Sequence, residues 1–544
     1  MLARLVRTVS RRPEAVLPDR RKHLTLLAVI MGSFVASLDS TVVSVALPSI
    51  SRSLGGGLAG QQWVVNAYLL ALGSFLLLGG SLGDVFGERR VFAAGVAGFG
   101  LMSAVCALSP SIDVLVVARA IQGLAGALLT PAALAVIIAT FPSRERGAAI
   151  GTWMAWSGIA TVVGPLAGGE LLSVVSWRFI FAINLPFVAL TLALTTAVPA
   201  SDKRREQDLD VLGAALAAAG LGGPVFALIE QPKLGWGSPA VLGPALGGIV
   251  LLGAFTVWES RNQAPMLPLQ LFRIRNFAFG NLETLVLYGG LGALFLYLVI
   301  FLQQIAGYSP LRSGLATLPT SIVMFALSRP FGRLADRFGV RWFMGGGPLL
   351  AAAGLAYLLR LNAHVSYLTD LLPGLVVFSL GLAATVAPLT AGVLSGADPS
   401  RAGVASAVNN TMARVGGLLA TAAIGAVVAA RFTASLQARL PHPLSAVDQA
   451  ALTSALHQPL AVPIIHGHSP TELSLVEAAR SAAISGFHRG LIVIIVLVTL
   501  AGIFGLLGIR DAATVPAAEC GTGASTDASA HAAPTLSAAP ELPS

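Results

Sequence analysis

Long apolar runs recur along nearly the whole chain and decide what it can fold into. Each is about 20 residues long, the length that a helix needs to cross the hydrocarbon core of a bilayer. The 544 residues are 55% hydrophobic and only 11% charged, whereas soluble domains average roughly 25% charged residues. The runs predict an all-α membrane protein with spans at 24–46, 61–83, 91–109, 113–139, 147–168, 177–198, 210–231, 239–258, 277–303, 313–332, 342–361, 368–395, 404–430 and 484–508.

The basic residues predict how these spans are oriented. Of the 34 Lys and Arg residues, 22 fall on the side of the two termini, 6 in loops on the other side and 6 within spans. Because basic residues are enriched in cytoplasmic loops, we expect a multi-pass protein of the plasma (inner) cell membrane with both termini in the cytoplasm. The basic residues are distributed over short loops instead of one face, so nucleic-acid binding is not expected.

A repeated stretch predicts the domain organisation. GSLGDVFGERR (Gly80–Arg90) matches GRLADRFGVRW (Gly332–Trp342), and each copy follows the second span of a six-span block. Copies on the same side predict two parallel six-helix bundles. The expected parts are a basic N-terminus at 1–23, a first bundle at 24–198, two additional spans at 199–276, a second bundle at 277–508 with an extracellular loop at 431–483, and a disordered cytoplasmic tail at 509–544.

Charged residues in and beside the two copies are candidate gating residues. Aspartate and arginine at neighbouring helix ends can pair in one conformation and separate in another, as a gate requires. The alternative is that they are ordinary solvated loop charges. The candidates are Asp84, Arg89, Arg90, Arg333, Asp336, Arg337 and Arg341.

The remaining chemistry-bearing residues argue against an enzyme. The two cysteines, Cys106 and Cys520, lie in an apolar segment and in the polar tail, so no disulfide is expected. His466 and His468 lack the Cys or acidic partners of a metal site. No nucleotide-binding motif occurs, which also argues against an ATP-driven pump. We expect no cofactor and no metal.

Further motifs carry a resemblance to a family. The repeated loop, RAIQG at Arg119–Gly123 and GPLAGG at Gly164–Gly169 resemble motifs of the major facilitator superfamily. LDSTVVSVALP, WRFIFAINLP and GYSPLRSGLATLP resemble its fourteen-span drug:proton antiporter branch, which also has two additional spans. The chain departs from the branch at Ser44, where Asn is usual, and at Val85 and Glu88, where Arg is usual.

Asp39 is the main candidate for proton coupling. At 1.5 Å per residue it lies roughly 22 Å into the first span, and Arg119 lies roughly 10 Å from the outer end of the fourth, so the two charges share a depth. The resemblance implies that both spans line a central cavity. Acids inside a membrane are costly and commonly functional. The alternative is a fixed Asp–Arg bridge that only holds two spans together.

Three weaker groups complete the candidate site. Glu283 in the ninth span binds protons, attracts cationic substrate or faces interfacial water. The fifth span carries a glycine-proline motif (Gly164, Pro165, Gly168, Gly169), which the resemblance associates with antiporters. It either allows the bundles to rock between two conformations or only packs helices together. Aromatic residues in the spans line the substrate cavity or mark the membrane interface. They include Trp63, Tyr68, Trp153 and Tyr288.

These features predict a proton-coupled antiporter that exports lipophilic compounds by alternating access and functions as a monomer in the bilayer. With one deep acid and one further candidate, neutral or monocationic substrates are favoured, because a dication needs two protons for electroneutral exchange. The alternatives are a dedicated exporter of one endogenous antibiotic, lipid or siderophore, and a proton-coupled importer.

Overall fold

The computed structural model describes residues 18–199, 209–395, 402–439, 460 and 470–511. Several sequence predictions lie outside these residues. They concern most of the basic N-terminus, much of the 431–483 loop with His466 and His468, and the tail from residue 512 with Cys520.

Within the described ranges every regular element is a helix, and fourteen helical segments are long and apolar enough to cross a membrane. This confirms the predicted number of spans. The α-helices are α1 (Asp19–Leu54), α2 (Gly57–Phe86), α3 (Glu88–Leu108), α4 (Ile112–Thr140), α5 (Ser143–Val174), α6 (Phe179–Ala182), α7 (Asn184–Leu194), α8 (Val211–Leu234), α9 (Pro239–Arg261), α10 (Arg275–Gln304), α11 (Pro310–Phe338), α12 (Val340–Tyr357), α13 (Leu372–Ser395), α14 (Ala402–Gln437) and α16 (Pro470–Gly508).

The observed helices differ from the predicted spans mainly at their ends and at one break. α1 has 36 residues and continues beyond the predicted 24–46 at both ends. The sixth span, predicted as one run, is divided into α6 and α7. Pro186 has no N–H to donate to the carbonyl of Ala182, so the helical ladder lacks a bond at this point. α7 therefore begins at Asn184, a residue of the site described below.

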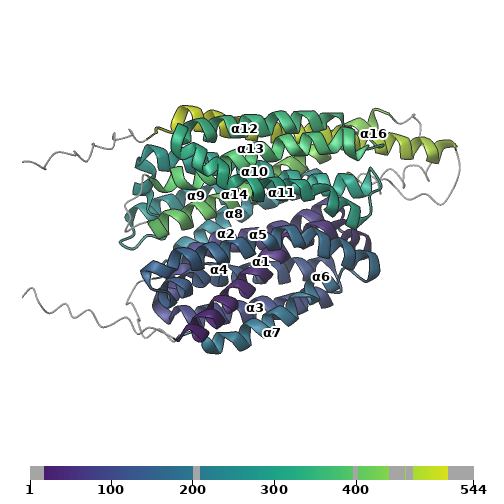
Figure 1. Ribbon diagram of the computed structural model, residues 1–544. Coiled ribbons are helices and arrows are strands. Elements are labelled where there is room, and N and C mark those ends of the chain that lie inside the picture. The colour runs from purple at the N-terminus through teal and green to yellow at the C-terminus, as the bar shows by residue number, and fades with distance from the viewer. Residues whose placement is uncertain (1–17, 200–208, 396–401, 440–459, 461–469, 512–544) are drawn as a thin grey trace, which may run out of the picture. The chain divides into compact units, whose positions relative to one another are not determined.

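The helices pack as two groups, with α8 beside both (Figure 1). α1 to α7 contact one another, and α10 to α16 contact one another. α8 contacts α2 and α14, and its apolar stripe of Leu221, Val225 and Ile229 packs with Leu418 and Ala422 of α14. α9 packs mainly against α8.

The two groups meet toward one end of the helices. We call the end where α1 turns into α2 the α1–α2 end, and the opposite end the α2–α3 end. One core cluster joins Leu47 and Leu58 of the first group to Phe301 and Ala316 of the second, all toward the α1–α2 end. A separate cluster, including Val29, Phe92 and Ile137, fills the first group toward the α2–α3 end. The structure is therefore closed between the groups at the α1–α2 end.

The repeated sequence produces the same turn twice. α2 ends at Gly87 with φ 91° and ψ 132°, and α11 ends at Gly339 with φ 97° and ψ 136°. Each glycine N–H donates to the carbonyl four residues earlier, in Gly83 and Ala335. Backbone angles in this region are strained for any residue with a Cβ. The glycines of the repeat are thus needed to end one helix and begin the next at the α2–α3 end.

We expect Gly87→Ala and Gly339→Ala each to destabilise the protein by about 1–3 kcal/mol, the cost of holding a side-chain-bearing residue in this region. Thermal unfolding of the purified protein in detergent measures the effect. Gly237→Ala is the control, since Gly237 lies in a loop with no atom within 4 Å of an added Cβ. Equal midpoints for all three variants would contradict the prediction.

Candidate functional site

Asp39 and Arg119 form a buried ion pair between α1 and α4. Arg119 Nη1 lies 2.5 Å from Asp39 Oδ2, and the two side chains are 2% and 0% exposed. Their shared depth, together with the family resemblance, predicts that these residues are neighbours, and the structure brings them together. Because an uncompensated charge in such a place is costly, each side chain stabilises the other.

Polar side chains from two further helices complete the surroundings of the carboxylate. Asn184 Nδ2 donates to Asp39 Oδ1 at 3.0 Å and to Ser103 Oγ at 2.8 Å. Arg119 Nη1 also donates to Gln122 Oε1 at 2.8 Å, and Gln122 Nε2 lies 3.4 Å from Asp39 Oδ1. Asn184, Ser103 and Gln122 are fully buried. Both carboxylate oxygens therefore accept hydrogen bonds, which offsets much of the cost of burial.

The ion pair is connected to a contact between the two groups of helices. Arg119 Nε donates to the Val64 carbonyl of α2 at 3.2 Å, and the guanidinium carbon lies 4.2 Å from the centre of the Tyr68 ring. Val64 lies between Gln62 and Asn66, and these two side chains reach α14. The segment of α2 that Arg119 holds is therefore the segment that meets the second group.

This contact is a buried set of hydrogen bonds that we call the α2–α14 latch: Gln62, Asn66, Tyr297 and Thr421. Gln62 Nε2 donates to Tyr297 Oη at 3.0 Å and to Thr421 O at 2.9 Å. Tyr297 Oη donates to Thr421 O at 2.6 Å, and Thr421 Oγ1 donates to Asn66 Oδ1 at 2.7 Å. The latch joins α2 to α10 and α14 toward the α1–α2 end.

The glycine-proline motif of α5 makes the second close contact between the groups. A Cβ on Gly168 would stand 2.5 Å from Val42 Cγ2, and a Cβ on Gly164 would collide with Thr41. These two glycines thus press α5 onto α1 within one turn of Asp39. Gly169 faces the other way, where a Cβ would lie 2.5 Å from Leu311 Cα. The motif packs α5 against the acid-bearing helix on one side and against α11 on the other.

Glu283 lies apart from the ion pair, inside the second group. It is fully buried on α10, and neither carboxylate oxygen has a hydrogen-bond partner within the described residues. Gly290, two helical turns away on the same face, packs against Val498 of α16. Glu283 therefore lies on the face of α10 that is next to α16.

The predicted gating residues lie at the α2–α3 end, where most are exposed. Asp84, Arg90, Arg333, Asp336 and Arg337 are exposed, and Arg89 is half-buried. Arg341 Nε donates to Leu506 O at 2.7 Å, at the end of α16. The gating role of these residues stays a prediction.

The predicted cavity aromatics have separate surroundings. Tyr68 covers Arg119, and Trp153 Nε1 donates to Ser33 Oγ of α1 at 2.8 Å. Trp63 Nε1 donates to Glu230 Oε1 of α8 at 2.8 Å, beside a cavity of about 870 Å³ between α2, α4, α8 and α14. Tyr288 lies on α10 near Gly417. The role of these aromatic residues as substrate contacts stays a prediction.

Sequence reasoning missed several polar members of the site. Asn184 and Gln122 stand within the motifs WRFIFAINLP and RAIQG, but the motifs alone do not predict that these side chains bond to the carboxylate. Ser103 and three latch residues, Gln62, Asn66 and Thr421, carry no motif, whereas Tyr297 is one of the aromatic residues in the spans that are expected to line the cavity or mark the interface. The available signal was a polar side chain inside an apolar span, at the depth of Asp39.

Fourteen spans around a buried ion pair are the architecture of a polytopic membrane transporter, not of an enzyme. A family model described as Major Facilitator Superfamily matches residues 29–421. The chain belongs to the Major Facilitator Superfamily.

Curated relatives span most of this chain. The tetracenomycin C resistance and export protein of Streptomyces glaucescens is 36% identical, over 85% of this chain and 87% of the relative. The puromycin resistance protein pur8 of Streptomyces alboniger is 38% identical, over 79% and 86%. The multidrug resistance protein Stp of Mycobacterium tuberculosis is 35% identical, over 78% and 79%.

Solved structures match the fold at low sequence identity. A bacterial homologue of the human lysosomal transporter Spinster has a TM-score of 0.61 at 16% identity, over 90% of this chain and 98% of that one. The xylose transporter XylE of E. coli has a TM-score of 0.52 at 16% identity, over 91% and 97%.

We expect Gly169→Ala to separate α5 from α11, because the Cβ would meet the Leu311 backbone, which cannot rotate away. Spin labels on Arg52→Cys and Arg312→Cys, both exposed at the α1–α2 end, report the separation in a Cys520→Ser background. The variant should populate a longer distance. Gly158→Ala, in the same helix with no atom within 4 Å of its Cβ, should not. An unchanged distance distribution in Gly169→Ala would refute the wedge argument.

Proposed function

We propose that this protein is a proton-coupled antiporter that exports lipophilic, neutral or monocationic small molecules from the cytoplasm by alternating access. In this proposal both termini are cytoplasmic, the α1–α2 end faces outward, and one chain suffices for transport. The observation that carries the proposal is the buried Asp39–Arg119 pair, bonded through Arg119 to the part of α2 that closes the two bundles.

Charge balance links the proton to the conformation. With Asp39 ionised, Arg119 is neutralised in place and holds the Val64 carbonyl beside the latch. A proton on Asp39 removes that compensation, and the buried guanidinium then favours an arrangement in which it reaches water or another acceptor. The ionised pair thus stabilises the form closed outward, and protonation favours its opening.

The same argument gives the direction of exchange. Asp39 takes a proton from the outer side when the α1–α2 end is open, and releases it inward when that end closes and the pair with Arg119 re-forms. Substrate loads from the cytoplasm in the form with ionised Asp39 and leaves outward before the next proton binds. One proton contributes about 1.4 kcal/mol per pH unit and about 2.3 kcal/mol per 100 mV.

Glu283 is a second candidate for carrying a proton in this cycle. An ionised carboxylate buried without a partner is costly, and Glu283 has no partner within the described residues. Glu283 stands roughly 21 Å of helical rise from Tyr297, the latch residue on the same helix α10. This separation favours an auxiliary role over direct coupling.

A second candidate function is the export of one endogenous compound. Two relatives bear the names of single exported or resisted antibiotics, tetracenomycin C and puromycin, which supports a narrow substrate range as well as a broad one. Comparing resistance to many chemically diverse compounds with and without the gene separates the two. A narrow range would give loss of resistance to one chemical class.

We expect Asp39→Asn to abolish uphill transport. In everted vesicles with an imposed pH gradient, accumulation of the lipophilic cation ethidium should fall at least about tenfold. A tenfold loss corresponds to about 1.4 kcal/mol. Downhill exchange should persist, because the amide keeps the shape of the site. Asp113→Asn, an exposed aspartate on α4, is the control. Normal uphill accumulation by Asp39→Asn would overturn the coupling role.

We expect Tyr297→Phe to loosen the closed form. The substitution removes the hydrogen bonds of Tyr297 Oη with Gln62 and Thr421, and losing about 1 kcal/mol shifts the closed-to-open ratio roughly fivefold. Proteoliposomes with a trapped pH dye should then show faster proton leak without substrate. Tyr357→Phe, which loses a bond to Thr369 O elsewhere in the second bundle, should leak normally. Equal leak in both variants would exclude the latch role.

A further inference from the structure

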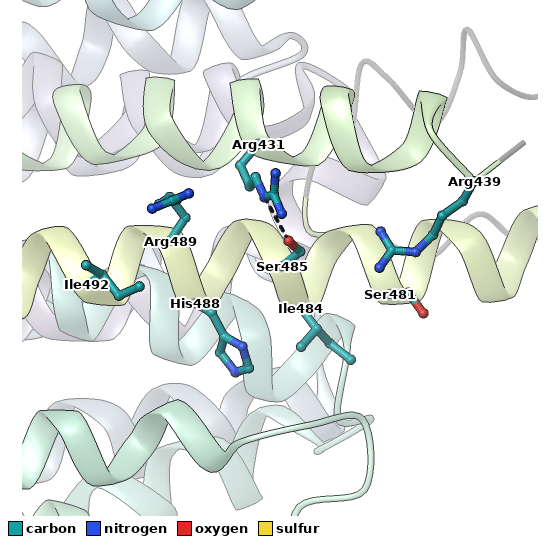
Figure 2. Close-up of a pocket in the computed structure, with 8 residues that line it drawn as sticks. All are labelled: Arg431, Arg439, Ser481, Ile484, Ser485, His488, Arg489 and Ile492. Atoms are coloured by element: carbon teal, nitrogen blue, oxygen red, sulfur yellow. Dashed lines mark hydrogen bonds between the residues drawn. The ribbon is translucent and has the colours of Figure 1, made fainter.

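A basic pocket lies between α14 and α16, away from the ion pair (Figure 2). Its volume is about 520 Å³, and the eight residues that line it include three arginines and no acidic residue. Arg431 comes from α14, Arg439 lies in the turn that follows α14, and Arg489 comes from α16. In Figure 2, Arg431, Arg439 and Arg489 reach into the space between the two helices.

The arginines retain most of their hydrogen-bonding capacity. Arg431 Nε donates to Ser485 Oγ at 3.0 Å, and Arg439 Nη1 donates to Ser435 O at 3.2 Å. Each guanidinium has five N–H donors. No ion pair of the described residues involves Arg431, Arg439 or Arg489. The pocket therefore has an excess of positive charge and of donors suited to a bidentate oxyanion.

The pocket lies where the hydrocarbon core ends. At the other end of α16, Arg341 and Arg275 donate to the carbonyls of Leu506 and Leu507, which marks the interface on the α2–α3 side. Arg489 is roughly 25 Å from Leu506 along the helix, close to the thickness of the hydrocarbon core, about 30 Å. The segment between them, 490–505, has no charged residue. Arg489 thus lies at the opposite interface, and Arg431 lies beside Ser485, one turn further out.

An apolar stripe continues from the pocket into the membrane. Along α16, exposed or half-exposed side chains recur every three or four residues below Arg489, as one helix face requires. They are Ile492, Val496, Leu500, Ile503 and Leu507. Positive charge at the headgroup level above a continuous apolar track matches an amphiphile with a phosphate and a fatty chain.

We propose that the pocket binds the phosphate of an anionic phospholipid in the leaflet on the α1–α2 side, with an acyl chain along the stripe of α16. Basic pockets between membrane helices recognise such headgroups. Arginines that only reach the interface individually need no shared cavity, whereas these three line one pocket. A lipid held here bridges α14 and α16, and α14 carries Thr421 of the latch.

Native mass spectrometry of the full chain tests the site, with phosphatidylglycerol and phosphatidylcholine as probes. Wild type should retain phosphatidylglycerol in preference to phosphatidylcholine. Arg431→Gln/Arg489→Gln should lower phosphatidylglycerol retention at least about tenfold, since each arginine near an anionic headgroup contributes severalfold to affinity. Phosphatidylcholine retention should not change.

The matched control is Arg52→Gln/Arg312→Gln, which removes the same charge from exposed positions at the same end and should retain phosphatidylglycerol. Should the pocket variant not fold, Arg489→Gln alone is used, because Arg489 makes no hydrogen bond within the described residues. Equal retention by pocket variant and wild type overturns the proposal. The proposal is also overturned if millimolar inorganic phosphate displaces the lipid and stabilises the protein against thermal unfolding as well as the lipid does. That result would assign the pocket to a soluble anion.

Discussion

The ion pair between Asp39 and Arg119 constrains the packing of the first helical bundle, because neither charge is stable there alone. Removing one partner of a buried pair costs about 3–5 kcal/mol. The surrounding helices must therefore supply every remaining donor and acceptor. α4 supplies Gln122, α7 supplies Asn184 and α2 supplies the Val64 carbonyl. Five helices, α1, α2, α3, α4 and α7, are thus positioned relative to one carboxylate, with Ser103 of α3 accepting from Asn184.

The ion pair has mechanical consequences because the contacts between the bundles begin next to it. Gly164 and Gly168 bring α5 onto α1 one turn from Asp39, and Gly169 on the opposite face of α5 touches α11. On the other side, Arg119 holds the segment of α2 that enters the latch. Because the glycines bring the backbones of neighbouring helices into contact, a displacement of α5 displaces α1 and α11 as well. The hydrogen bonds of Arg119 couple its charge to the position of α2, since Arg119 requires a compensating acceptor.

Sequence reasoning reached the number of spans from helical rise and bilayer thickness. It reached the Asp39–Arg119 contact from the shared depth of the two charges, together with the family resemblance, which implies that both spans line the cavity. It could not reach the rotation of each helix about its axis. Depth places Glu283 at a plausible level, but the structure is needed to show that its face of α10, shared with Gly290, is the face next to α16. Likewise Trp63 bonds with Glu230 of α8, a contact 167 residues apart. The family resemblance is confirmed by the matching family model, whereas the proton-coupling, gating and cavity roles of individual residues stay predictions.

The two additional spans pose a mechanical problem, because α8 contacts α2 and α14, the helices of the latch. A rigid bridge across both would oppose any separation of the bundles. The contact of α8 with α14 consists of Leu221, Val225 and Ile229 against Leu418 and Ala422, and no hydrogen bond joins α8 to α14 within the described residues. Apolar packing is non-directional, so α14 can shift along this stripe at small cost. The directional bond is to α2, from Trp63 to Glu230. α8 is therefore suited to move with the first bundle while the second slides against it.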